Sequence, residues 1–203
     1  MGQLFVISAP SGAGKTSLVK ALLQARPNLV VSVSHTTRTP RPQEVEGRDY
    51  YFVTPAQFHE LVRAGAFLEH ASVFDNFYGT GRAQIERKLA GGKDVLLEID
   101  WQGAQQVRRA MPAAKTIFIL PPSRAVLEQR LRERRTDSAE TIARRLADAA
   151  ADMSHCKEFD FVVVNDEFGQ ATGDLGSILD GGGAELRASR PEISGLIQHL
   201  IAG

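Results

Sequence analysis

The clearest chemical signal in this sequence is a glycine-rich segment near the N-terminus that ends in a lysine and two hydroxyl residues. It reads SAPSGAGKTS over residues 8–17, follows an apolar run that predicts a strand, and opens a predicted helix. This is the setting of a phosphate-binding P-loop, in which glycines let backbone N–H groups close around phosphate oxygens and the helix N-terminus adds positive potential. The motif predicts an ATP site made by Ala9, Pro10, Ser11, Gly12, Ala13, Gly14, Lys15, Thr16 and Ser17.

Lys15 and Thr16 supply the side-chain chemistry of this loop. A lysine here places a compact charge against the β- and γ-phosphates, and the threonine hydroxyl is a Mg²⁺ ligand. A nearby acid is expected to complete the Mg²⁺ shell, and Asp100 follows a predicted strand, with Glu98 two residues earlier on the same face. The alternative for both acids is a structural cap at the strand end. Ala9 replaces the first glycine of the motif, which costs little if its φ is negative.

A second group of candidate residues lies in the stretch after the second predicted strand. Arg38 and Arg41 are three residues apart and suit a bidentate grip on a phosphate. Tyr50 and Tyr78 could each donate a phenolic hydrogen bond to the same anion. Taken singly, the arginines could decorate a solvated loop and the tyrosines could be core residues. Glu69 is different, because it is an acid in an apolar setting.

A carboxylate within a group of anion binders suits guanine. Guanine offers N1–H and the 2-amino group as adjacent donors, and one carboxylate can accept both, whereas adenine would leave the carboxylate unpaired. Unpaired buried partners of this kind give discrimination on the order of 10⁴-fold. The hydroxyls of Ser34 and Thr80 could satisfy the guanine O6.

Five segments in this order resemble bacterial guanylate kinases: VSHTTRTPR, GRDYYF, FLEHA, FYGT and LEIDWQGAQQVR. The resemblance runs from about Gln3 to Asp166. It implies direct in-line transfer of the γ-phosphoryl group of MgATP to GMP, and to dGMP as a further acceptor, with Mg²⁺ held by Thr16 and Asp100. It further implies a GMP site made by Ser34, Arg38, Arg41, Tyr50, Glu69, Tyr78, Thr80 and Glu98.

Arginines in the charged stretch after residue 123 complete the predicted catalytic set. Arg130 and Arg134 are four residues apart and share a helix face, and Arg145 lies on the next predicted helix. A closing lid can bring such arginines to the transferring phosphoryl group while excluding water. The resemblance assigns this role to the three arginines, together with Lys15, and implies that Asn165 lies beside the adenine. Relatives commonly have glycine where this chain has Arg135.

Alternating strands and helices must position these residues. Apolar runs predict strands at residues 4–7, 29–33, 95–99, 116–120 and 161–164, and helical patterns fall at 16–25, 82–90, 102–111, 124–134 and 139–153. Near-continuous apolar strands indicate a parallel sheet covered on both faces, hence a doubly wound α/β fold. The stretch after residue 33 instead predicts short strands at 50–53 and 67–73 around a helix at 55–64, and a last helix is expected at 191–201.

The predicted organisation has three parts. Residues 1–33, 82–122 and 153–203 form an α/β P-loop core, residues 34–81 a small mixed α/β GMP-binding insertion, and residues 123–152 a helical lid. Nothing in the sequence predicts a structure between residue 169 and the glycine-rich break at 181–183.

The composition of the chain limits the partners and the cellular compartment that can be expected. Lysine plus arginine equals aspartate plus glutamate at 24 each, so no global field favours nucleic acid. The single cysteine, Cys156, favours a reducing compartment and a packing role, and no segment predicts a signal peptide or membrane span. A cytoplasmic protein is expected, and self-association through the last helix stays open.

Two alternatives accompany the kinase hypothesis. One is a non-catalytic guanylate-kinase-like binding module, against which Lys15, Thr16 and the arginine-rich lid argue, because such a module has no use for an ATP site. The other is a kinase of the same fold that phosphorylates a sugar phosphate, and Glu69 is the residue that discriminates between the two kinases.

Overall fold

The computed structural model describes residues 1–73, 75–133 and 138–202. By its contacts the chain divides into two compact units. The first comprises Met1–Val6 with Asn28–Ala114, and the second comprises Ile7–Pro27 with Lys115–Gly203.

A five-stranded sheet forms the core, in the order β2-β7-β1-β8-β9. Its pairs β2–β7 and β8–β9 are parallel, as predicted from the unbroken apolar character of the strands. The central strand β1 is entirely buried and leads into the glycine-rich segment. The bounds are β1 (Leu4–Ser8), β2 (Leu29–Val31), β7 (Asp94–Glu98), β8 (Lys115–Leu120) and β9 (Phe161–Val164).

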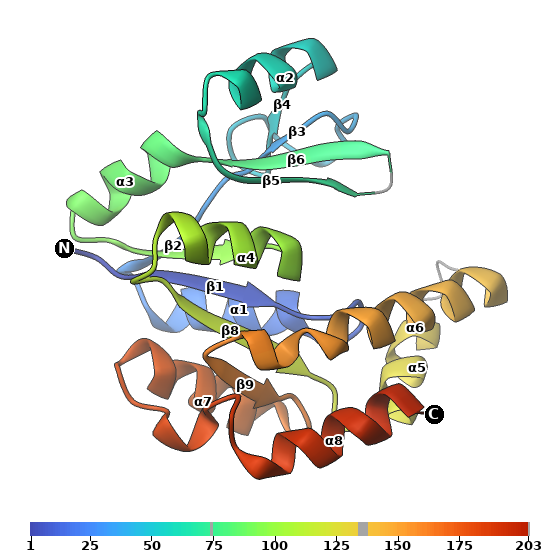
Figure 1. Ribbon diagram of the computed structural model, residues 1–203. Helices are drawn as coiled ribbons and strands as arrows, with labels where there is room; N and C mark the ends of the chain where they lie inside the picture. The colour runs from blue at the N-terminus through green and yellow to red at the C-terminus, as the bar shows by residue number, and fades with distance from the viewer. Residues whose placement is uncertain (74, 134–137, 203) are drawn as a thin grey trace. The chain divides into compact units, whose positions relative to one another are not determined.

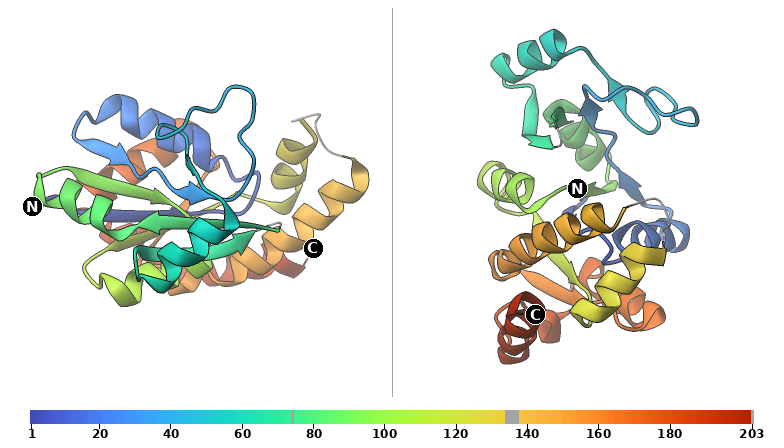
Figure 2. Two further views of the ribbon diagram at one scale, coloured as in Figure 1. Left: turned by 90° about the horizontal axis from the view of Figure 1, so that it is seen from above. Right: turned by 90° about the vertical axis from the view of Figure 1, so that its right-hand side faces the viewer.

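A small mixed sheet occupies the stretch predicted to be an insertion, in the order β4-β3-β6-β5. Strands β3 and β4 are parallel, whereas β6 is antiparallel to both β3 and β5. Its strands are β3 (His35–Thr36), β4 (Tyr51–Phe52), β5 (Phe67–Val73) and β6 (Asn76–Gly81). Figure 2 shows the loop between β3 and β4 projecting away from these strands.

Three helices belong to the same unit as this sheet: α2 (Pro55–Arg63), α3 (Arg82–Ala90) and α4 (Trp101–Ala110). Helix α2 begins with a capping box between Thr54 and Gln57. Its buried Phe58 stacks on Phe77 of β6, with ring centroids 5.4 Å apart. Helix α4 packs against β5, as Figure 1 shows. The sheet is therefore held between helices at fixed positions.

The second unit carries five α-helices within its described residues: α1 (Lys15–Ala25), α5 (Arg124–Glu133), α6 (Ala139–Ser154), α7 (Phe168–Leu179) and α8 (Pro191–Ala202). Helices α6 and α8 run side by side in Figure 1. Short 3₁₀ turns at Cys156–Glu158 and Ala184–Leu186 join the later elements. Cys156 is fully buried, as predicted, and burial raises the pKa of its thiol to about 11.

Helices α1 and α7 pack together and are joined beyond their C-terminal ends. The Arg26 guanidinium donates to both carboxylate oxygens of Asp180, at 2.6 and 2.7 Å, and to the carbonyl of Gly176, at 3.1 Å. The pKa of Asp180 is lowered by this hydrogen-bonded cation. Residues 154 positions apart in the sequence thus meet at one point.

The observed elements confirm the α/β fold with its parallel core and small mixed sheet. Helix α3 and strands β5 and β9 have the predicted bounds, and β2 ends two residues earlier than predicted. Strands β3 and β6 and helix α7 were not predicted. Among the described residues, no helix is long and apolar enough to cross a membrane.

Candidate active site

The phosphate loop follows β1 and ends at α1. Gly12 and Gly14 both have φ of +92°, a conformation that side-chain-bearing residues rarely adopt. Asp75 is the single non-glycine residue with positive φ among those that the structure describes, so Ala9 has a negative φ as required for its tolerance. Lys15 is the first residue of α1 and is half-buried, whereas Thr16 is exposed. The loop therefore ends at a helix N-terminus, as predicted.

Asn165, directly after the end of β9, is hydrogen-bonded to this loop. Its side chain is buried and donates a 2.7 Å hydrogen bond to the carbonyl of Ala13. A Cβ on Gly14 would lie 2.3 Å from that amide nitrogen, so only glycine lets the two segments approach this closely. Its predicted place beside the adenine stays a prediction, but its side chain is clearly engaged by the loop.

A pocket of about 410 Å³ opens beside the loop, within the second unit, and is lined by Gly12, Gly14, Ser17, Arg130, Glu133, Asn165, Asp166 and Phe168. The Arg130 guanidinium donates to the carbonyl of Asn165 at 3.1 Å. Its other terminal nitrogen, Nη1, is buried and has no hydrogen-bond partner among the described residues. A buried cationic nitrogen without a partner fits an anionic ligand in this pocket.

Of the other predicted lid residues, Arg145 is half-buried on α6, and Arg134 and Arg135 lie outside the described residues. Helix α5 is anchored to the phosphate loop, because a Cβ on Gly12 would lie 2.9 Å from Leu127 and 3.1 Å from Leu131. Both leucines are fully buried. The base of the predicted lid is therefore packed against the loop itself.

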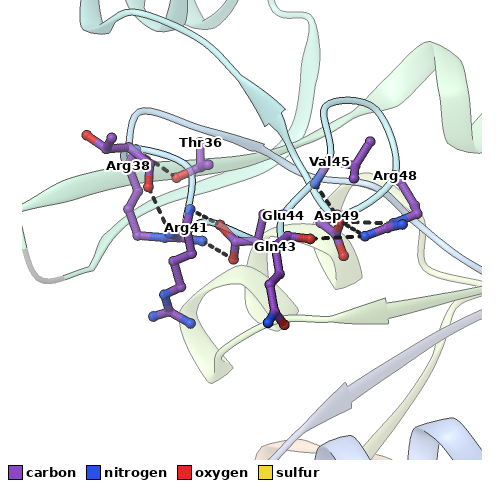
Figure 3. A network of polar contacts seen from close by, with 9 residues as sticks. Thr36, Arg38, Arg41, Gln43, Glu44, Val45, Arg48 and Asp49 are labelled. Atoms are coloured by element: carbon purple, nitrogen blue, oxygen red, sulfur yellow. Dashed lines mark hydrogen bonds and ion pairs between the residues drawn. The ribbon is translucent and has the colours of Figure 1, made fainter.

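In the first unit, Arg38 and Arg41 meet at one carboxylate, that of Glu44 (Figure 3). Arg38 donates to Glu44 Oε1 at 2.6 Å, and the backbone N–H of Arg41 donates to Oε2 at 2.8 Å. The hydrogen bond from Arg38 is the main cause that lowers the pKa of Glu44 and raises the pKa of Arg38. Arg38 also donates through its backbone to the Thr36 hydroxyl at 3.1 Å. The loop thus presents an ordered cationic group.

Two tyrosines face this cation. The Arg38 guanidinium carbon lies 5.4 Å from the centre of the Tyr50 ring, and the rings of Tyr50 and Tyr78 are 6.0 Å apart, edge to face. Tyr78 is a smaller cause of the raised pKa of Arg38. Burial raises the pKa of Tyr50, with smaller contributions from its charged neighbours, Glu98 among them. The phenol of Tyr50 therefore remains a hydrogen-bond donor at neutral pH.

Glu69 and Thr80 form a buried pair across β5 and β6. The two residues are direct partners in the antiparallel register, and Thr80 Oγ1 donates to Glu69 Oε1 at 2.5 Å. Glu69 is only 4% exposed. Burial raises the pKa of Glu69 to about 7, and the nearby charge of Asp100 adds to this, although the bond from Thr80 opposes it. A carboxylate this costly to bury is well suited to recognise a donor pair on a ligand.

Asp100 acts as the N-cap of α4. Its Oδ1 accepts a 2.8 Å hydrogen bond from the backbone N–H of Gly103. The structural alternative for Asp100 is thus observed, and a second carboxylate oxygen remains for other ligands. Ser34 is half-buried directly before β3, and its carbonyl accepts from the backbone N–H of Tyr51 at 2.9 Å.

Comparison with known proteins agrees with this geometry. The family model described as guanylate kinase matches residues 1–181. The guanylate kinase of Methylococcus capsulatus (strain Bath) is 54% identical over 200 residues, which cover 98% of this chain and 98% of that protein. The chain belongs to the guanylate kinase family. The guanylate kinase of Escherichia coli K12 is 52% identical over 203 residues, with 99% and 98% of the two chains covered.

A solved guanylate kinase has the same fold. The crystal structure of the Anaplasma phagocytophilum enzyme is similar with a TM-score of 0.72 at 35% identity, covering 97% of this chain and 94% of that one. The resemblance identified from the sequence is therefore confirmed.

Sequence reasoning missed two residues of this guanylate kinase that contact predicted site residues. Glu44 lies in the same loop as both arginines, and an acid three residues after Arg41 was a visible signal for an internal ion pair. Phe168, 48% exposed, lines the pocket beside the phosphate loop, and no pattern in the sequence marks it as a site residue.

Proposed function

We propose that this guanylate kinase transfers the γ-phosphoryl group of ATP to GMP and releases ADP and GDP. The observation that carries the proposal is the buried Glu69–Thr80 pair. A carboxylate with one oxygen bound by a hydroxyl and the other directed elsewhere can accept from the adjacent N1–H and 2-amino donors of guanine. Adenine offers no equivalent pair of donors.

At the acceptor, the phosphate of GMP would be bound by the guanidinium groups of Arg38 and Arg41 and by the hydroxyls of Tyr50 and Tyr78. Glu44, whose carboxylate already holds Arg38 and the Arg41 N–H, would keep these donors in place. Thr80 and Ser34 would hydrogen-bond the base beside Glu69. Guanine donors favour the ionised acid, so binding would draw the pKa of Glu69 down from about 7.

At the donor, the backbone N–H groups of the loop and the charge of Lys15 would hold the β- and γ-phosphates, and the unpartnered Nη1 of Arg130 would face their charge. Mg²⁺ would neutralise charge on the phosphates, with Thr16 and Asp100 as its protein ligands and Glu98 nearby. The described residues include no group of three acidic, histidine or cysteine side chains that could hold a metal. This fits a Mg²⁺ held mainly by phosphate oxygens and only one or two protein groups.

Transfer would be direct. The GMP phosphate oxygen is the nucleophile, and a phosphate monoester is largely ionised at neutral pH, so no protein base is needed. Lys15, Arg130, Arg134 and Arg145 would stabilise the charge that develops on the transferring group. We assign residues 34–81 the role of acceptor-binding insertion and residues 123–152 that of lid, on a core of residues 1–33, 82–122 and 153–203. A cytoplasmic location and use of dGMP also stay predictions.

The test is an assay of ADP release with MgATP and a panel of GMP, dGMP, AMP, UMP and CMP. Turnover with GMP far above AMP is expected, and Glu69→Gln should lower kcat/KM for GMP by on the order of 10²-fold or more while leaving ATP binding intact. ATP binding without turnover of any monophosphate would favour the sugar-phosphate kinase. Failure to bind ATP would favour the binding module.

A further inference from the structure

Gly103 lies in the first turn of α4, against the Glu69 carboxylate. A Cβ at this position would lie 2.8 Å from Glu69 Oε2, 3.2 Å from Ile99 Cδ1 and 3.4 Å from Asp100 Oδ1. Its φ is not positive, so alanine could adopt the same backbone conformation. Helix propensity also favours alanine over glycine. The absence of a side chain is therefore explained by the space that the carboxylate occupies, and not by the backbone.

The carboxylate cannot easily move out of the way. Its Oε1 is held by Thr80 at 2.5 Å, and the side chain is 4% exposed, so a displaced position would have to be found inside packed structure. The strand register that pairs Glu69 with Thr80 fixes the backbone beneath it. Displacement would break the hydrogen bond that orients the acid.

Helix α4 cannot easily move either. Gln106, one turn after Gly103, donates from Nε2 to the carbonyl of His70 at 2.8 Å and accepts from the N–H of His70 at 3.1 Å. His70 directly follows Glu69 on β5. The N-cap bond from Gly103 to Asp100 fixes the start of the helix. The distance between Gly103 and the carboxylate is thus set on both sides by hydrogen bonds.

We propose that Gly103 is a specificity-determining positioning residue, whose missing side chain reserves the space in which the Glu69 carboxylate reads the guanine base. This rests on the proposed role of Glu69 as the base-reading acid. A methyl group at residue 103 displaces one carboxylate oxygen from its position for the base. The phosphate loop and the side chains proposed for the GMP phosphate lie on other segments. A Cβ at residue 103 would approach Asp100, the proposed Mg²⁺ ligand, only to 3.4 Å, an ordinary contact distance, so the effect falls on recognition of the base.

The measurement is the ratio of kcat/KM for GMP to that for IMP, which lacks the 2-amino donor. Gly103→Ala should lower this ratio at least tenfold and leave KM for ATP within twofold. The matched control is Gly173→Ala on α7, because a Cβ there meets no atom of the described residues within 4 Å. The control should leave both quantities unchanged. A normal GMP-to-IMP ratio in Gly103→Ala would overturn the inference.

A double-mutant cycle with Glu69→Ala separates this inference from the proposal on which it rests. If Gly103 acts through the carboxylate, Gly103→Ala has no further effect on the ratio once Glu69 is alanine. A further loss in the double variant would show that Gly103 acts elsewhere and would overturn the inference. An unchanged ratio in Glu69→Ala alone would refute base reading by Glu69 instead.

If Gly103→Ala is too unstable to assay, the melting temperatures of the single and double variants test the same inference. The clash involves the Glu69 carboxylate, so the double variant should then recover the melting temperature of Glu69→Ala. A double variant as unstable as Gly103→Ala would place the clash elsewhere and overturn the inference.

Discussion

The phosphate loop and the proposed acceptor region differ in the groups that they offer to an anion. The loop is ten consecutive residues whose donors are backbone N–H groups, shaped by two glycines at φ +92° and held by one buried asparagine. The proposed acceptor region offers side chains from Ser34 before β3, from the loop before β4, from β5 and β6, and from Glu98 at the end of β7. A site made of backbone recognises the phosphates that all nucleoside triphosphates share. A site made of side chains can also recognise the base.

The acceptor region further contains two carboxylates in opposite states. Glu44 has its pKa lowered by the bond from Arg38, whereas burial raises the pKa of Glu69 to about 7. The first acid is neutralised by a cation of the protein, and the second lacks one. Of these two acids, only Glu69 is left for a ligand to stabilise. We therefore call Glu44 the positioning acid and Glu69 the recognition acid.

The largest effect should come from the one side-chain cation of the phosphate loop. Lys15→Met removes the charge expected on the β- and γ-phosphates, and kcat should fall on the order of 10³-fold. The change should leave the fold intact by circular dichroism. Lys20→Met, on the exposed face of the same helix, is the control and should retain full activity. Equal loss in both variants would contradict a specific role for Lys15.

The next effect tests whether the loop depends on its buried asparagine. Asn165→Ala leaves the Ala13 carbonyl without its 2.7 Å donor, a loss of about 1–3 kcal/mol. KM for ATP should rise about 10- to 100-fold, with KM for GMP little changed. Asn28→Ala removes an exposed bond to the Gly92 carbonyl and should have no such effect. A rise in KM for GMP alone would show that the two regions are not separable.

The pH should affect kcat/KM for GMP through the ionisation of Glu69. Only the ionised acid can accept both guanine donors, so kcat/KM for GMP should rise about tenfold between pH 6 and pH 8, with a midpoint near 7. The GMP phosphate also titrates in part of this range. The profile of Glu69→Gln supplies the control, because it retains the phosphate titration and should lack the inflection near 7. Identical profiles would contradict the assignment.

The raised pKa of Glu69 also makes the free energy of unfolding depend on pH, and this dependence has the opposite sign to that of kcat/KM for GMP. The folded chain binds the Glu69 proton more tightly than the unfolded chain, since the pKa rises from its ordinary 4.5 to about 7. Its contribution to the free energy of unfolding therefore decreases as pH rises through this interval and is constant above it. Chemical denaturation of the wild type and Glu69→Gln across this interval would reveal the difference.

The smallest effect concerns the positioning acid. Glu44→Gln removes the charge that holds Arg38, so KM for GMP should rise about fivefold or less, and the difference should shrink at high salt. Glu86→Gln, which removes the exposed partner of Arg82 in the same unit, is the control. A fall in KM for GMP would instead mean that Glu44 competes with the phosphate.

The two regions also differ in how far the sequence predicts them. The phosphate loop was predicted residue by residue. Its functional groups are consecutive in the sequence, and glycine is the residue type that the positive φ angles of the loop favour. Most of the acceptor residues were proposed from their residue types, and the resemblance to a family supported them and added Glu98. Their mutual contacts were not predicted, because Glu69 meets Gly103 only after β5 and α4 have packed together.

Local sequence patterns did not predict the elements whose formation depends on tertiary packing. Strand β3 has two residues and β6 contains two glycines, so neither carries a clear strand signal. Helix α7 contains three glycines, which lower its intrinsic helix propensity. Burial of Ala171, Leu175 and Ile178 on one face stabilises it nevertheless.

The join at Arg26 has a consequence for the pocket beside the phosphate loop. Helices α1 and α7 have 11 and 12 residues, both begin at this pocket, and both end at the Arg26 guanidinium. Two parallel helices accumulate negative partial charge at one end and positive partial charge at the other. Arg26 lies at the negative ends, where it is paired with the Asp180 carboxylate. The positive ends of both helices lie at the pocket, so in the proposed reaction the phosphates of ATP would be a counterion that arrives and leaves with each catalytic cycle.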